Sequence, residues 1–459
     1  MLQQSICAGL MALAVLVTGC GGGGGGDTAT SPPVPPAEAA LPGLALVKLR
    51  AQGDTQWVAL SERVRALQEL STPDRVLLLS RPAPAQPLTV AAPAGWAMVD
   101  MDVHPSGQLS VVLAQADALR LLRLAADGQV LADQAFDDPG WRDDPFLGDA
   151  DLVRGALLMP RVTLDAVRLA AQGEQAVLAL RSGRAAVVAH GLRWQGGAYA
   201  RSWRTLVEPG VYIGARRTTS GSFDPFGSLD NPWQLRLDVA DDGRVALAVG
   251  LGHTELAQGH QQHFGEPTAG AGEDGALLTR LAADGRRLGT TLVATGMRNE
   301  LHGLRWQGTG LVLIGRVRPG IRADGGSWDG WLAWVDAASG ALQQQQTLDV
   351  DRSDQLFDAI RLADGRWLLA GSTGYWQNPT GASISEEAQP LLALLPAPGQ
   401  AVQRLALQAA PRHNQARALL AQAGGAWVAG MANGPGTHSA DADPALLVAD
   451  GFARRVVLP

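Results

Sequence analysis

The 459-residue chain has a formal net charge of −7, with 37 Lys and Arg residues against 44 Asp and Glu residues. This mildly acidic balance, without a basic patch in which aromatic residues are interleaved, excludes a nucleic-acid partner. The only cysteines are Cys7 and Cys20, so the chain after residue 20 excludes disulfides, thiol nucleophiles and cysteine-ligated metals. The length exceeds what one ordinary hydrophobic core supports, which predicts several domains or a repeat architecture.

Residues 1–19 have the pattern of a secretory signal peptide. The apolar run at 6–17 is too short to cross a bilayer as a helix but fits the apolar region of such a signal. The stretch VTGC at 17–20 resembles the lipobox of bacterial lipoproteins, although no Lys or Arg precedes the apolar run. The resemblance implies that Cys20 is the first mature residue and carries the lipid.

Residues 20–40 form a predicted tether. Glycines at 21–26 are followed by a proline-rich stretch, and neither has the periodicity that packing requires. A folded domain is therefore expected at residues 41–459. Gly21 differs from the acidic retention signal of some inner-membrane lipoproteins, which favours anchoring to the outer membrane of a bacterial cell envelope.

The remaining chain repeats one pattern: an apolar segment, a tight turn built on Gly or Asp, and a second β-rich segment. This pattern is typical of a β-hairpin. The clearest copies begin at positions 99, 164, 235, 301, 357 and 416, and a degenerate copy begins at Val64. A second hairpin pattern follows most copies, for example ALLTRLAADGRRLGTTLV at 276–293 and ALLVADGFARRVVLP at 445–459.

Two hairpins per repeat predict four-stranded antiparallel sheets, and no segment has sustained helical periodicity. Four-stranded sheets repeated around an axis form a β-propeller. We therefore expect an all-β propeller of seven blades, with the first and last blades packing together to close the ring. The segment LALVKLRAQGDTQWVALS at 44–61 also resembles the second hairpin of a repeat, so six or eight blades are the alternatives.

The hairpins resemble the repeats of β-propellers found in bacterial secreted and surface proteins. The turn VDAASGALQ at 335–343 is also similar to the Asp-x-x-Thr/Ser-Gly turn of quinoprotein-type propellers, although most copies lack the tryptophan that closes that motif. The resemblance covers most of the chain after the tether. It implies the propeller fold and does not assign an activity.

The long connecting segments are all predicted on one side of the ring. If the strands of a blade are named a to d from the axis outward, the a–b and c–d turns are short, such as ADDG and APGQ. The long insertions fall between strands b and c or between strand d and the next strand a, for example at 252–274 and 207–232. Long loops on a rigid scaffold commonly carry recognition, so we expect a ligand on this long-loop face.

A ring of polar residues is expected where the axis meets the long-loop face. Aligning the repeats places five of them at the start of the innermost strand: Asp100, Asp165, His302, Asp358 and Arg417. Such a ring could hold a cation or a small polar ligand. The alternative is structural, with these side chains accepting hydrogen bonds from the backbone and pinning neighbouring blades together.

Four aromatic residues are expected in the long loops: Trp141, Trp328, Tyr375 and Trp376. Aromatic rings among carboxylates and amides are suited to stacking on sugars or to gripping a peptide. The alternative is that the rings fold inward and anchor the loops.

One histidine-rich insertion is a candidate metal site, because it contains His253, His260 and His263. Their spacing matches no established metal site, and a solvated polar loop is the alternative. The segments DPFLGD (144–149) and DPFGSLD (224–230) could hold calcium or another cation, but neither follows the spacing of a known calcium loop. No cofactor is therefore predicted.

No catalytic motif is present: the chain lacks a nucleophile elbow, a phosphate-binding glycine loop and a His-Glu zinc helix. We therefore predict a lipid-anchored module that binds or scaffolds a protein or glycan through the long-loop face, with the membrane as a second partner. The alternatives are a hydrolase or quinone-type enzyme that uses the same face, and a structural assembly subunit.

Overall fold

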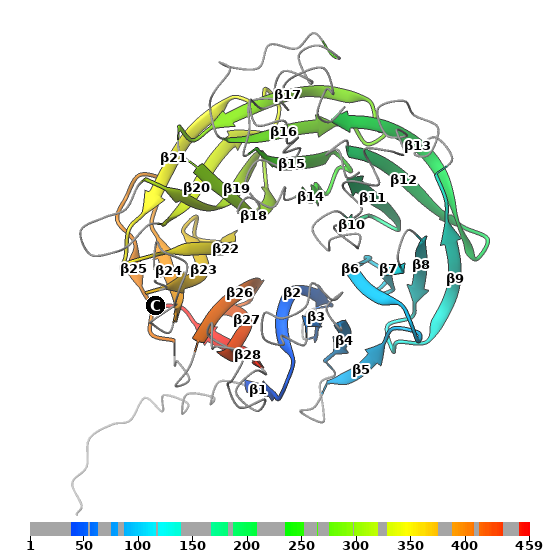
Figure 1. Cartoon of the computed structure of the whole chain (residues 1–459), viewed down its shortest axis with the longest axis horizontal. Coiled ribbons are helices and arrows are strands. Elements are labelled where there is room, and N and C mark those ends of the chain that lie inside the picture. Colours follow the sequence, from blue (N-terminus) through cyan, green and yellow to red (C-terminus); the bar gives the residue numbers. More distant parts are fainter. Residues whose placement is uncertain are drawn as a thin grey trace, which may run out of the picture. The chain divides into compact units, whose positions relative to one another are not determined.

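The computed structural model describes residues 38–53, 56–62, 75–80, 87–115, 118–138, 167–181, 187–208, 235–251, 264, 275–296, 298–319, 328–374, 388–407, 413–434 and 449–459. One compact unit extends from Pro36 to Pro459. Its described residues form 28 strands in seven four-stranded antiparallel sheets. The sheets are arranged as the blades of a propeller (Figure 1). The predicted fold class and the count of seven blades are confirmed.

The first three blades follow one another along the chain. Blade 1 contains β2 (Ala45–Gln52), β3 (Gln56–Glu62), β4 (Arg75–Leu79) and β5 (Leu88–Ala91). Blade 2 contains β6 (Ala97–Val103), β7 (Leu109–Gln115), β8 (Ala118–Leu124) and β9 (Val130–Phe136). Blade 3 contains β10 (Val167–Gln172), β11 (Gln175–Arg181), β12 (Val187–Gln195) and β13 (Ala198–Glu208).

Blades 4 to 6 repeat this order, and blade 7 differs in its outer strand. Blade 4 contains β14 (Leu235–Val239), β15 (Val245–Leu251), β16 (Gly275–Leu281) and β17 (Arg287–Ala294). Blade 5 contains β18 (Arg298–Gln307), β19 (Gly310–Arg318), β20 (Asp329–Asp336) and β21 (Leu342–Leu348). Blade 6 contains β22 (Gln355–Arg361), β23 (Trp367–Thr373), β24 (Gln389–Leu395) and β25 (Gln403–Arg404). Blade 7 contains β26 (His413–Gln422), β27 (Gly425–Gly434), β28 (Asp450–Val457) and β1 (Glu38–Leu41).

The ring is closed by a strand from the N-terminal end of the compact unit. β1 pairs antiparallel with β28, with Glu38 opposite Arg454 and Leu41 opposite Gly451. The sequence predicts a hairpin at 445–459, but the described residues of this segment form one strand, β28. The outer partner of β28 is β1, from the other end of the chain. Three residues of the predicted tether, at 38–40, belong to this closing strand.

The first blade begins earlier than the repeat alignment indicated. The segment at 44–61 forms the inner hairpin β2–β3, and the degenerate copy from Val64 contributes the third strand, β4. The pattern misassigned these segments because inner and outer hairpins both consist of an apolar segment, a tight turn and a second apolar segment.

The hydrophobic core is divided among the blade interfaces. The described residues form seven large apolar clusters, each between two consecutive blades, including the pair of blade 7 and blade 1. Between blades 5 and 6, for example, Ile314, Leu356 and Leu369 are fully buried. Burying one such side chain contributes about 1.5–3 kcal/mol. This arrangement explains why the middle strands are apolar on both faces.

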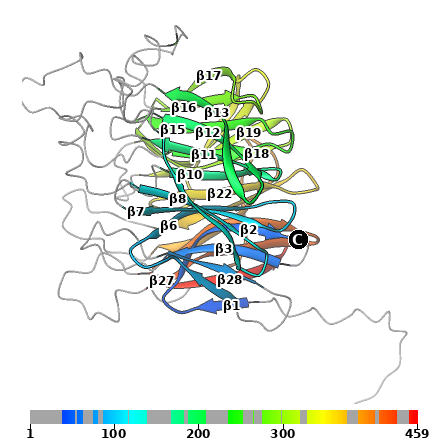
Figure 2. The same ribbon diagram turned by 90° about the vertical axis from the view of Figure 1, so that its right-hand side faces the viewer.

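The two ends of the ring differ in their connections. The inner and outer hairpins close with tight turns, as at 125–128, where the N–H of Gly128 donates to the carbonyl of Ala125 and Gly128 has a φ of 88°. In the side view the strands run between the two faces of the ring (Figure 2). Every connecting segment of more than eight residues joins strand ends on the face opposite these turns. No helix in the described part of the chain is long and apolar enough to cross a membrane.

Candidate functional site

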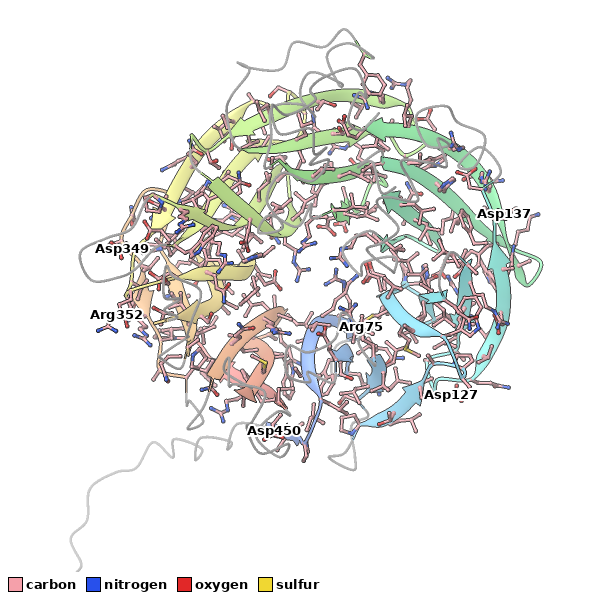
Figure 3. The ribbon with its side chains drawn as sticks, viewed as in Figure 1. Arg75, Asp127, Asp137, Asp349, Arg352 and Asp450 are labelled. Carbon is pink, nitrogen blue, oxygen red and sulfur yellow. The ribbon has the colours of Figure 1, made fainter. Side chains whose placement is uncertain are left out.

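The innermost strands of the seven blades surround the axis: β2, β6, β10, β14, β18, β22 and β26 (Figure 1). Each of these strands contacts the innermost strand of the next blade. Side-chain nitrogen atoms point into the centre of the ring, and Arg75 lies on the axial side of blade 1 (Figure 3). The candidate site lies where these strands begin, on the long-loop face.

Five innermost strands contain a β-bulge at the same position. In each, one residue near the start of the innermost strand has no partner on the neighbouring strand b, so the pairing shifts by one residue. A bulge re-aims a side chain and locally bends the strand. The inserted residues, which we call the bulge residues, are Val47, Val99, His302, Phe357 and Arg417.

Glycines on strand b make room for the bulges of blades 5 to 7. A Cβ atom on any of these glycines would lie far inside van der Waals contact of a carbonyl oxygen two residues before the bulge residue. Only a residue without a side chain fits such a close backbone approach. The three glycine–carbonyl pairs are Gly315 with Glu300, Gly371 with Gln355, and Gly430 with Gln415.

The bulge residues of blades 5, 6 and 7 form a continuous stack, which we call the bulge arc (His302, Phe357 and Arg417). The rings of His302 and Phe357 are stacked, with centroids 5.0 Å apart and an interplanar angle of 21°. The guanidinium carbon of Arg417 lies 5.9 Å from the centroid of the Phe357 ring. Nδ1 of His302 donates to the carbonyl of Leu356 at 2.8 Å, which fixes the imidazole against blade 6.

A buried ion pair between Arg316 and Glu300 contacts the His302 end of the arc. Arg316 holds both carboxylate oxygens of Glu300, at 2.9 and 2.8 Å. Burial alone would raise the pKa of Glu300, but Arg316 and His302 outweigh it and lower that pKa to about 2. The Arg316 guanidinium also lies 4.2 Å from the centroid of the Trp328 ring. Trp328 is only 5% exposed, so this ring folds inward and anchors the start of β20.

Axial aspartates join blade 2 to blade 3, blade 4 to blade 5, and blade 6 to blade 7. Asp100 accepts from the backbone N–H of Leu169 in blade 3 at 2.9 Å, and Asp358 accepts from that of Leu419 in blade 7 at 2.8 Å. Two further aspartates do the same: Asp102 accepts from Ala171 at 2.9 Å, and Asp238 accepts from Trp306 at 2.5 Å. The structural alternative considered for the polar ring therefore describes Asp100 and Asp358.

Cations of the preceding blade neutralise three of these aspartates. The pairs are Lys48 with Asp100 at 2.7 Å, Arg50 with Asp102 at 2.9 Å and Arg305 with Asp358 at 2.6 Å. Burial opposes ionisation of Asp100, but Lys48, Arg168 and the Leu169 N–H together lower its pKa below the ordinary value. All three carboxylates are engaged in ion pairs and hydrogen bonds that join neighbouring blades.

Arg417 differs from the other axial cations. Its Nε donates to Oε1 of Gln415 at 2.7 Å, and its Nη2 reaches only the thioether sulfur of Met431, at 3.8 Å. No carboxylate of a described residue lies within ion-pair distance of it. Burial is the largest influence on Arg417 and lowers its pKa. The carboxylate of Glu62 raises the pKa of Arg417 and the guanidinium of Arg75 lowers it, and these two residues are paired with each other at 3.1 Å.

The sequence-predicted residues thus separate into four groups. Trp328 is one of them, because it is buried against Arg316. His302 and Arg417 meet on the bulge arc, and Asp100 and Asp358 lie one residue further along their strands, directly after the bulge. Within the described ranges, no group of three or more His, Cys, Asp or Glu residues could hold a metal ion. The other predicted residues lie outside the described residues: Cys20, Asp165, Trp141, Tyr375, Trp376, His253, His260 and His263.

Sequence reasoning missed the central aromatic residue of the arc and the residues that support it. The recurring glycine near the end of strand b was visible in the sequence, and it marks the bulge in blades 5 to 7. The missed residues are Phe357, Glu300, Arg316, Gln415, Asp102, Asp238 and Arg305.

No protein-family model matches the chain, and no curated protein sequence matches it. Similar solved structures include YCF48 bound to D1 peptide, with 11% identity, 93% of this chain and 96% of that chain covered, and a TM-score of 0.45. The WD40 repeats of RRP9 have 8% identity, cover 92% of this chain and 98% of their own, and give a TM-score of 0.47. The WD40 propeller domain of Doa1 has 8% identity, covers 90% and 95%, and gives 0.43. These likenesses concern the fold alone.

Proposed function

We propose that this protein is a binding module of the bacterial cell envelope that holds a protein partner on the long-loop face of a rigid propeller. The observation that carries the proposal is the bulge arc. It presents an aromatic ring, and a guanidinium without a carboxylate partner among the described residues, where the axis meets that face. Aromatic and arginine side chains are the residues that most often dominate the binding energy of protein interfaces.

The axial carboxylates favour binding over catalysis. General acid–base chemistry needs a carboxyl group that can reach the substrate and exchange a proton near the working pH. Asp100 and Asp358 instead accept hydrogen bonds from the next blade and pair with Lys48 and Arg305. The hydrolase alternative would therefore need an acid pair other than these two.

Site-specific photo-crosslinking in cells tests the choice of face. Benzoylphenylalanine would replace Pro319, which is exposed and follows β19 on the long-loop face, or Asp284, which is exposed in the turn between β16 and β17 on the opposite face. We expect a discrete protein adduct from position 319 and none from position 284. Adducts of equal yield from both faces, or none from position 319, contradict the proposal, and a glycan partner would give no protein adduct.

We further propose that a lipid on Cys20 anchors the module to the outer membrane. The VTGC stretch at 17–20 supports this proposal, and the glycine- and proline-rich residues that follow provide reach from the membrane. The Cys20→Ser variant is expected to lose its incorporated palmitate label and to move from the membrane fraction to the soluble fraction. Full retention in the membrane fraction would contradict the anchor.

A further inference from the structure

We infer that the bulge arc is a carboxylate-recognition site, and that it takes a carboxylate of an acidic peptide segment against Arg417 and Phe357. The inference rests on the proposed binding function and adds the chemical class of the ligand. The carboxylate is either the C-terminal one of the peptide or one of its Asp or Glu side chains, because both present the same planar pair of oxygens.

The hydrogen-bonding state of Arg417 is the first support. A guanidinium has five N–H donors, and only the Nε donor of Arg417 reaches an oxygen among the described residues. Arg305 and Arg316 provide the comparison, since each directs two nitrogens at one carboxylate. Arg305 and Arg316 use their Nε–Nη2 edge, whereas in Arg417 Nε is bonded to Gln415 and Nη2 contacts the sulfur of Met431. The Nη1–Nη2 edge of Arg417 therefore has no oxygen partner among the described residues and can bind a carboxylate bidentately.

The placement of the guanidinium is the second support. The bulge of β26 directs Arg417 toward Phe357, whose ring is in turn stacked on His302. His302 is held by the Leu356 carbonyl and by the Arg316–Glu300 ion pair behind it. A guanidinium held beside a fixed aromatic ring loses less conformational entropy when it binds an anion.

The charge balance around the arc is the third support. The axial cations Lys48, Arg50 and Arg305 each have a carboxylate partner, and Arg168 and Arg236 donate to backbone carbonyls of the next blade. Arg417 has only an amide and a thioether among the described residues. Leaving a partly buried charge uncompensated is costly, and an incoming carboxylate would supply the missing negative charge. Burial also lowers the pKa of Arg417, because it disfavours the charged guanidinium. A bound anion would favour that charged form.

Isothermal titration with matched small probes tests the inference on the full chain. The probes are N-acetylglutamate α-amide (side-chain carboxylate), N-acetylglutamine (terminal carboxylate), N-acetylglutamine amide (neutral) and inorganic phosphate. We expect at least one carboxylate probe to bind at least tenfold more tightly than the neutral probe and more tightly than phosphate. The stronger of the two carboxylate probes identifies which source the site prefers.

Variants assign the binding to the arc. Arg417→Gln is expected to lower the affinity of the preferred probe at least tenfold, and Phe357→Leu to lower it several-fold. Arg366→Gln is the matched control, because Arg366 lies in the a–b turn of blade 6 on the opposite face and pairs with Asp364. It should leave binding unchanged.

Stability distinguishes a ligand site from a structural arginine. Removing an uncompensated charge should leave the thermal unfolding midpoint of Arg417→Gln unchanged or raise it. A clear fall in that midpoint, seen in both Arg417→Gln and Arg417→Lys, would overturn the inference. Two titration results would overturn it as well: a carboxylate probe that still binds to Arg417→Gln, or phosphate that binds more tightly than both carboxylate probes. If these results occur while position 319 still crosslinks to a partner, the inference fails and the proposed function stands.

Discussion

Replacing Asp358 with alanine is expected to lower the free energy of unfolding by about 3–5 kcal/mol, the usual cost of removing one partner from a buried ion pair. Asp358 accepts two hydrogen bonds from Arg305 of blade 5, at 2.8 and 2.6 Å, and one from the Leu419 N–H of blade 7. One side chain of blade 6 therefore joins three consecutive blades. Burial alone would lower the pKa of Arg305, but Asp358 raises it, so Asp358→Ala leaves a charged and unpaired guanidinium on the axis.

Urea denaturation followed by intrinsic tryptophan fluorescence would measure this effect. Asp358→Asn should fall between wild type and alanine, because the amide oxygen still accepts from Leu419 while the charge is lost. Asp133→Ala is the control: Asp133 pairs with Arg120 on the outer strands of blade 2, where both side chains are about 30% exposed, and such pairs contribute about 0–1 kcal/mol. Equal losses at positions 358 and 133 would mean that the axial pairs do not hold the blades together.

The blade architecture was predictable because it depends on local patterns. A tight turn with Gly or Asp between two apolar segments predicts a hairpin without knowledge of distant contacts, and most of the seven blades contain two such hairpins. The closing strand β1 was not predictable in this way. Its sequence, EAAL, is too short to show alternation, and it becomes a strand only because β28 offers an unpaired edge.

The site was only partly predictable because bulges shift the register. The ungapped repeat alignment placed Asp100, His302, Asp358 and Arg417 at one position. In the structure His302 and Arg417 are bulge residues, whereas Asp100 and Asp358 follow the bulge. Because side chains alternate along a strand, a shift of one residue changes the direction of the side chain.

Two consequences follow from that shift. The residues after the bulge face the neighbouring innermost strand, where their carboxylates hold the ring together. The bulge residues of blades 5 to 7 stack on one another instead. A sequence alignment that aligned the recurring glycine of strand b would separate these two sets, because that glycine is opposite the residue before the bulge in all three blades.

Removing β1 should have the second large effect, because it opens the ring. A chain that begins at residue 42 lacks the β1–β28 pairing and the Leu41 side chain, which is 8% exposed in the cluster between blades 7 and 1. Burial of one leucine contributes about 1.5–3 kcal/mol and each backbone hydrogen bond about 1 kcal/mol, so we expect a loss of at least about 3 kcal/mol. A chain that begins at residue 36 keeps β1 and serves as the control.

The comparison of these two truncations, by urea denaturation and by the concentration dependence of light scattering, measures the closure directly. The chain from residue 36 should unfold at the same urea concentration as the full chain. The chain from residue 42 should unfold at lower urea and self-associate, since β28 becomes an exposed edge strand. If both truncations have the same midpoint, the seven blades hold together through their interfaces alone and β1 is dispensable. The expected difference would show instead that residues 38–41, three of which belong to the predicted tether, close the ring on which a rigid binding face depends.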